Sequence, residues 1–142
     1  MRIGLFGGSF NPIHRGHVAI ARAARTALGL DRLILIPSAR PPHKRHDSTL
    51  APAEDRLAMA RLAVGEDEGL SVADIELKRE GPSYTIDTVR AFLASEPGSE
   101  IHFVIGADSV PELRTWRDAR TLLSLAKFAV VAAALEAELR SW

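Results

Sequence analysis

Two histidines close together in a glycine-containing loop are the side chains best suited to chemistry in this sequence. Residues 7–17 read GGSFNPIHRGH, and His14 and His17 stand three positions apart, so their rings share one face if a helix begins there. The loop's glycines permit unusual backbone conformations and let a ligand approach the main chain. A helix start adds free N–H groups and the positive end of the helix dipole. The string therefore predicts an anion site, and its alternative interpretation is a turn with two surface histidines.

An apolar run before this loop and a helical pattern after it indicate a strand–loop–helix unit, and the alternation continues along the chain. Strands are expected at residues 3–6, 33–36, 72–77, 102–105 and 128–131, and helices at 16–28 (ended by Gly29), 52–64, 83–93 and 132–140. Capping-box spacing at Ser109–Glu112 and Thr115–Asp118 predicts two more short helices. The alternation favours one α/β domain over residues 1–142, a Rossmann-like doubly wound parallel five-stranded sheet with helices on both faces.

In such a sheet, ligands bind at the carboxyl ends of the strands, near the point where the strand order reverses. The least ordinary segments of the sequence fall at those ends: residues 7–17 after the first strand, 37–46 after the second, and 106–116 after the fourth. We therefore expect these three segments to meet at one site.

The composition restricts the classes of function. With 142 residues, of which 46% are hydrophobic and 25% charged, the chain can bury a core. Its 18 Lys plus Arg balance its 18 Asp plus Glu, so nucleic-acid binding through the basic loop at 40–46 is a weak alternative. There is no cysteine, which excludes disulfides and thiolate metal sites. No signal-peptide pattern is present, and no apolar run approaches the about 20 residues of a membrane helix. We expect a cytoplasmic protein without membrane or nucleic-acid partners.

The GGSFNPIHRGH string resembles the signature of the nucleotidyltransferase superfamily built on the H-x-G-H motif. It differs from a Walker A loop because no Lys-Ser or Lys-Thr ends it, and from the dinucleotide fingerprint because G-x-G-x-x-G is absent. Three further stretches are similar to nicotinate-mononucleotide adenylyltransferases: PSARPPHK at 37–44, SYTIDT at 83–88, and FVIGADS at 103–109 followed by Trp116-Arg117. These blocks occur in the family's order over nearly the whole chain.

This resemblance implies an enzyme that joins ATP and nicotinate mononucleotide into nicotinate adenine dinucleotide, with release of pyrophosphate. It implies no metal site in the protein, and Mg²⁺ enters bound to ATP. The acceptor's phosphate attacks the α-phosphorus in line, so positioning and charge stabilisation are the protein's tasks. The implied catalytic residues are His14 and His17. The implied ATP and phosphate contacts are Gly7, Gly8, Ser9, Phe10, Gly16, His43, Lys44, Ile105, Gly106 and Asp108, and those to nicotinate mononucleotide are Tyr84, Thr85, Trp116 and Arg117.

Several of these residues also have a structural interpretation. His43 and Lys44 belong to a basic loop that could simply be solvated. Thr85 could cap a helix, and Asp108 could be a loop acid beside a capping serine. Trp116 could lie in the core, which is the more common place for a tryptophan.

The end of the sequence departs from the family. Members continue with a Ser-Ser-Thr-x-x-Arg-type motif at the start of a late helix, which contacts the β- and γ-phosphates, and no such motif follows Val131. We therefore expect the domain to lack the family's C-terminal helical part, which leaves the activity of this chain open. Apolar surface that late helices would cover is then exposed or used in a homo-oligomer. The alternatives are another H-x-G-H adenylyl- or cytidylyltransferase, such as the phosphopantetheine enzyme, and a nucleotide-binding domain with little or no turnover.

Overall fold

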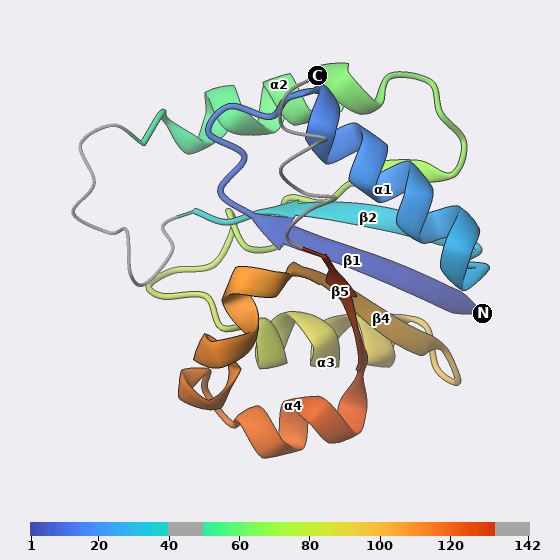
Figure 1. The fold of residues 1–142 in the computed structure, drawn as a ribbon. Helices are drawn as coiled ribbons and strands as arrows, with labels where there is room; N and C mark the ends of the chain where they lie inside the picture. The colour runs from blue at the N-terminus through green and yellow to red at the C-terminus, as the bar shows by residue number, and fades with distance from the viewer. Residues whose placement is uncertain (40–49, 133–142) are drawn as a thin grey trace.

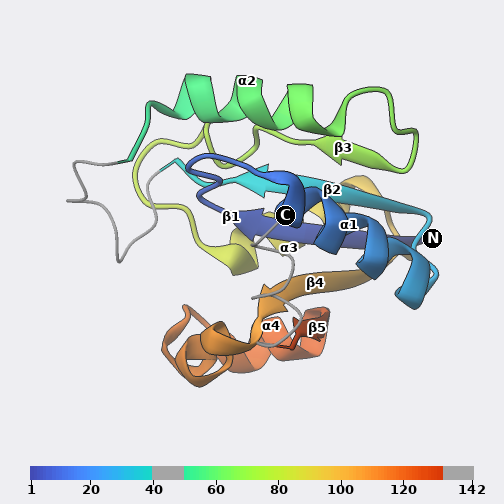
Figure 2. The same cartoon turned by 45° about the horizontal axis from the view of Figure 1, so that its top comes forward.

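The computed structural model describes residues 1–39 and 50–132. Its sheet consists of β1 (Arg2–Gly8), β2 (Arg32–Pro37), β3 (Leu70–Val72), β4 (Glu100–Gly106) and β5 (Lys127–Val131), all parallel, in the order β3-β2-β1-β4-β5. The helices are α1 (Arg15–Leu28), α2 (Ala53–Val64), α3 (Thr85–Ser95), α4 (Ala119–Leu125) and the 3-10 helix η2 (Ala107–Thr115). Figure 1 shows α1 and α2 above the sheet and α3 and α4 below it, and Figure 2 shows β3 and β5 at its two edges. The expected doubly wound parallel fold is confirmed.

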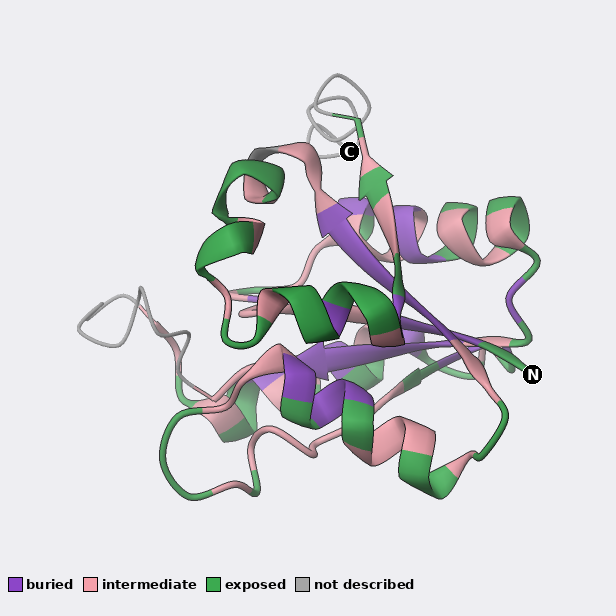
Figure 3. Cartoon of the chain, turned by 90° about the horizontal axis from the view of Figure 1, so that it is seen from below, coloured by how far each residue is buried: buried purple, intermediate pink, exposed green. Residues whose placement is uncertain are grey.

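Two apolar cores, one on each face of the sheet, hold these layers together. Leu33 and Leu35 of β2 pack with α1 and α2, whereas Ile34 and Ile36 of the same strand pack with α3 and α4. Successive strand residues point to opposite faces, so a strand covered on both sides must be apolar throughout. β2 and β4 are accordingly buried almost throughout, and strand segments are coloured as buried in Figure 3.

The sequence fixes both ends of α1 locally. The helix begins after His14, and it ends at Gly29, whose φ of +60° lies in the left-handed region. The Leu30 N–H then bonds back to the Arg25 carbonyl at 3.0 Å, which satisfies one of the last helix carbonyls. Only glycine adopts this conformation without strain from a side chain, so the expected stop at Gly29 is confirmed.

The structure departs from the predicted bounds of the third strand and from the two predicted capping boxes. The third strand covers Leu70–Val72 rather than 72–77, because the Asp74 carbonyl accepts N–H bonds from residues 77 and 78 and turns the chain. Neither predicted capping box forms: η2 begins after Gly106 and α4 after Asp118, and no side chain caps either helix. The Thr115 hydroxyl instead donates to the Glu112 carbonyl within η2, at 2.6 Å. From residue 133 on, the helix expected at 132–140 lies outside the described residues.

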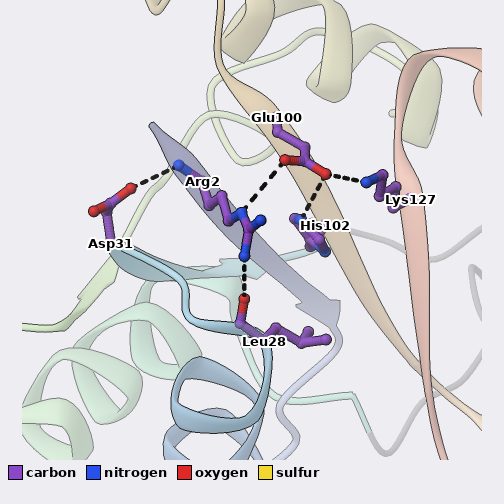
Figure 4. Close-up of polar contacts among 6 residues, drawn as sticks. All are labelled: Arg2, Leu28, Asp31, Glu100, His102 and Lys127. Carbon is purple, nitrogen blue, oxygen red and sulfur yellow. Dashed lines mark hydrogen bonds and ion pairs between the residues drawn. The ribbon is translucent and has the colours of Figure 1, made fainter.

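A cluster of charged side chains lies at the amino ends of the strands, opposite to the loops that follow them (Figure 4). Glu100 at the start of β4 pairs with Lys127 of β5 and with Arg2 of β1, the latter at 3.5 Å. Lys127, His102 and Arg2 lower the pKa of the Glu100 carboxyl, with Lys127 the largest cause. These pairs join three neighbouring strands at the end of the sheet away from the sequence motifs. Within the two described ranges, no helix combines the length and apolar character needed to span a membrane.

Candidate functional site

The strand order puts the switch point of the sheet between β1 and β4. The helices α1 and α2 cover one face of the sheet, and the chain then crosses to the other face with α3 before it enters β4 on the far side of β1. Ligands of open parallel sheets bind at such a switch point, outside the carboxyl ends of the strands. Gly8 ends β1 there and Gly106 ends β4, so the first-loop and fourth-strand motifs meet as expected.

The loop after β1 takes its special conformation at Phe10 rather than at its glycines. Phe10 has φ of +46° and its ring is 3% exposed in the core beneath α1. Neither Gly7 nor Gly8 has a positive φ, so the prediction that they supply unusual backbone angles is wrong. At Gly7 the missing side chain matters: a Cβ there would lie 3.1 Å from the Phe103 ring. Gly7 therefore leaves room for the Phe103 ring, and the buried Phe10 ring anchors the turn.

The two histidines form a reciprocal cap at the start of α1. The Nδ1 atom of His14 accepts from the Gly16 N–H at 3.0 Å, and the Nδ1 atom of His17 accepts from the His14 N–H at 3.0 Å. The ring centroids of the two histidines lie 3.8 Å apart, and the Phe10 and His17 rings are nearly perpendicular at a centroid distance of 5.2 Å. Both imidazoles are therefore fixed in position by the helix they begin.

This cap also sets the tautomer of each ring. A neutral imidazole carries one N–H, and a ring whose Nδ1 accepts a hydrogen bond carries its proton on Nε2. Both rings consequently present an Nε2–H donor on the side away from the backbone groups that they cap. Two oriented donors at the positive end of a 14-residue helix suit phosphate oxygens.

Arg56 of α2 is a site residue that the sequence analysis missed. Its side chain is 1% exposed and donates to the carbonyls of Ser9, Ser38, Ala39 and Ala51, at 2.6–2.8 Å. Burial lowers the pKa of the Arg56 guanidinium, which still stays protonated because an arginine titrates far above neutrality. One sequence signal could have identified it: Arg56 shares the apolar face of its helix with Ala60 and Val64, at four-residue spacing.

The end of β4 contributes backbone rather than an apolar side chain. Ile105 is 5% exposed and packs in the core beneath α3, so only its main chain can contact a ligand. Gly106 follows and precedes η2, the helix that contains Asp108. The side chains of His43 and Lys44 lie outside the described residues.

The residues expected to hold the pyridine nucleotide come together on the α3 side of the sheet. Tyr84 precedes the first residue of α3, Thr85, and the Arg117 guanidinium lies 4.7 Å from the Tyr84 ring centroid. Trp116 is half-buried against Phe103, at a centroid distance of 6.1 Å and an interplanar angle of 81°. Its ring is thus partly core and partly accessible, which combines the two interpretations of this tryptophan. No side-chain cap by Thr85 is found at the start of α3.

A polar network that the sequence analysis also missed supports the start of α3. The Glu76 carboxylate accepts from the buried Thr88 hydroxyl at 2.8 Å, and Arg79 donates to the same hydroxyl oxygen at 2.8 Å. The Ser83 hydroxyl donates to the Glu76 carbonyl at 3.3 Å. Burial raises the pKa of the Glu76 carboxyl, against smaller lowering effects of Thr88 and Arg79. The network thereby holds the segment before Tyr84 against the first turn of α3.

Comparison with known proteins shows the family of this chain. A model of the cytidylyltransferase-like family matches residues 5–140. A probable nicotinate-nucleotide adenylyltransferase of Symbiobacterium thermophilum is 45% identical over 130 residues, which are 92% of this chain and 62% of that protein. One of Thermus thermophilus is 47% identical over 132 residues, which are 93% of this chain and 69% of that protein. The chain therefore belongs to the cytidylyltransferase-like family, on the branch of the nicotinate-nucleotide adenylyltransferases.

A solved structure with the same fold is that of Plasmodium falciparum nicotinic acid mononucleotide adenylyltransferase complexed with NaAD. It has a TM-score of 0.74 and 14% sequence identity, and the match covers 95% of this chain and 78% of that one. This similarity shows the fold. The chain spans about three fifths to two thirds of the length of the curated relatives it matches.

Proposed function

We propose that this domain transfers the adenylyl group of ATP to nicotinate mononucleotide, giving nicotinate adenine dinucleotide and pyrophosphate. The observation that carries this proposal is the reciprocal histidine cap, which presents two Nε2–H donors at the switch point of the sheet. The names of its relatives, and the NaAD bound to the Plasmodium protein, support this choice of substrates.

In this reaction, an oxygen of the acceptor's phosphate attacks the α-phosphorus of ATP. The new P–O bond forms as the bond to the β-phosphate oxygen breaks, and pyrophosphate leaves with that electron pair. A phosphate oxygen is already nucleophilic, so the protein has to align the reactants and stabilise charge at the phosphorus and leaving group.

The first loop carries the phosphate half of the site in this proposal. His17 stabilises charge that develops at the α-phosphate and bridging oxygen, and His14 holds the phosphates. The main chain at Gly8, Ser9 and Phe10 binds phosphate oxygens, and Gly16, which is buried between the histidines, lets them come close. The remaining assignments to this half are Gly7, His43, Lys44, Ile105, Gly106 and Asp108.

The α3 side carries the pyridine half. The free N–H groups at the start of α3, near Tyr84 and Thr85, form the positive end of the helix dipole and suit the nicotinate carboxylate. Trp116 offers a half-buried aromatic surface for the pyridine ring, and Arg117, held over Tyr84, adds positive charge nearby.

We propose Mg²⁺ as the ion that accompanies ATP. In the described ranges, no three His, Asp or Glu side chains gather as a metal site. Mg²⁺ keeps several waters and commonly binds through substrate phosphates, so it would enter as part of the Mg–ATP substrate. We also infer a cytoplasmic protein, which stays a prediction from the sequence.

The decisive experiment is a turnover assay on this chain with pyrophosphate release as the readout. The panel pairs ATP or CTP with nicotinate mononucleotide, nicotinamide mononucleotide or phosphopantetheine. Turnover only with another pair would assign a different transferase, and calorimetric binding of ATP and nicotinate mononucleotide without turnover would assign a binding domain.

His17→Ala tests the assigned role of that side chain. The substitution should lower kcat far more than it raises KM for either substrate, because the donor is needed most in the transition state. A loss confined to KM would contradict the role.

A further inference from the structure

The surroundings of Arg56 differ from those of an ordinary buried arginine. In the described residues, its four hydrogen bonds all go to main-chain carbonyls, and no ion pair with a carboxylate is found. Burying a charge is costly unless it is well bonded. The Arg56 guanidinium thereby joins three separate segments: the loop after β1, the loop after β2, and Ala51, two residues before α2.

The guanidinium determines how two peptide groups are oriented. In a trans peptide the C=O of one residue and the N–H of the next point in opposite directions. Arg56 Nη1 holds the Ser9 carbonyl at 2.8 Å and the Ser38 carbonyl at 2.6 Å. The N–H groups of Phe10 and Ala39 must therefore point away from Arg56. The Ser38 N–H bonds to the Gly8 carbonyl at 2.9 Å, so the two loops are also joined directly.

We propose that Arg56 is a positioning residue that orients the Phe10 and Ala39 N–H groups toward the triphosphate of the bound nucleotide. The inference rests on the proposed function, because it takes the loop after β1 as the phosphate site. Arg56 acts from beneath this site, through the carbonyls it binds. Its positive charge adds attraction for the triphosphate.

Lysine and methionine variants separate orientation from charge. R56K keeps the charge, but an ammonium presents its donors from one point and lacks the planar fork that reaches four carbonyls. R56M removes both the charge and the donors. We expect ATP to bind at least about tenfold more weakly to R56K and more weakly still to R56M, since each lost charge-assisted bond frees a loop. The affinity for nicotinate mononucleotide should change less than about twofold, because its half of the site lies on the other face of the sheet.

Two control variants test whether weaker ATP binding could come from a general loss of stability. V64A trims a core side chain, 6% exposed, at the last residue of the same helix, two turns beyond Arg56. R32K makes the same chemical change at an arginine that pairs with Glu96 near the opposite end of the sheet, at 2.7 Å. Both should bind ATP as the unaltered chain does, although V64A lowers the free energy of unfolding.

Affinities are measured by calorimetry with ATP and with nicotinate mononucleotide, so turnover is not required. A chain that binds ATP but makes no dinucleotide would refute the proposed reaction and leave the role of Arg56 to be decided by these affinities. ATP binding by folded R56K within twofold of the unaltered chain would overturn that role, as would an equal weakening by V64A.

An NMR readout needs no variant and therefore stands even if R56M does not fold. When inorganic tripolyphosphate is added to the ¹⁵N-labelled chain, the Phe10 and Ala39 amide signals should shift among the most. Shifts confined to other residues would overturn the proposal.

Discussion

The histidine cap predicts that stability and catalysis can be separated at the same two positions. H14A/H17A removes both acceptors of the cap, each of which now takes a backbone N–H at 3.0 Å. Loss of an N-cap costs about 1 kcal/mol, and a half-buried N–H that loses its partner costs roughly another 0.5–1 kcal/mol. We therefore expect the free energy of unfolding to fall by about 1.5–2 kcal/mol. For 142 residues, this corresponds to a melting temperature lower by about 5–7 °C.

H14S/H17Q rebuilds an ordinary capping box, because serine at the cap and glutamine three residues later supply the same two acceptors. This variant should unfold within about 0.5 kcal/mol of the unaltered chain. It has no imidazole N–H, so its turnover should be as low as that of H14A/H17A. Urea unfolding followed by circular dichroism gives the stabilities, and pyrophosphate release gives the rates.

Two results would refute the reasoning. If H14A/H17A is as stable as the unaltered chain, the rings do not cap α1. If H14S/H17Q is as unstable as H14A/H17A, the histidines stabilise the helix start by contacts other than these two hydrogen bonds, such as the packing of His17 on Phe10.

Three further substitutions test other parts of the structure. Gly29→Ala should lower the free energy of unfolding by about 1 kcal/mol, because alanine is strained at φ of +60°; urea unfolding checks this, and ATP affinity should not change. Trp116→Ala should raise KM for nicotinate mononucleotide about tenfold because stacking on the pyridine ring is lost. Trp116→Phe keeps an aromatic ring, so its KM should stay close to that of the unaltered chain. Glu76→Gln should gain stability relative to the unaltered chain as pH rises above about 4.3, since the folded-state pKa of Glu76 is raised. Below that pH both forms are neutral, and ionisation of the buried carboxyl at higher pH destabilises only the unaltered chain; a pH series of unfolding curves decides.

Much of the fold could be predicted because its signals are local. β2 and β4 are covered on both faces. Residues 33–36 of β2 and 102–105 of β4 therefore each form a short run that is mostly apolar. The end of α1 is marked by Gly29, a signal that one residue type carries. The third strand was misplaced because it has three residues at a sheet edge, and its pairing with β2 leaves little pattern in the sequence.

The candidate site was predictable as a set of loops, but its supports were not. His14 and His17 could be recognised by spacing, yet their mutual cap through Nδ1 depends on the actual start of the helix. Arg56 bonds to residues as many as 47 positions away, and such long-range partners leave no local pattern. Capping-box spacing at Ser109 and Thr115 does not predict the helix starts, because both residues lie inside η2 and α4 begins only after Asp118.

The two halves of the proposed site are built on opposite faces of the sheet. Phe10 belongs to the core under α1 and α2, and Trp116 packs against the core under α3 and α4. The two faces adjoin at the carboxyl ends of β1 and β4, where a Cβ at Gly7 would lie 3.1 Å from the Phe103 ring. In-line attack requires the attacking oxygen, the phosphorus and the leaving oxygen on one line. Because each face holds one substrate in this proposal, that line must pass over the carboxyl ends of the paired strands β1 and β4. The reaction then depends on the position of the loop after β1 relative to β4. In the proposal above, Arg56 maintains that position through its bond to the Ser9 carbonyl.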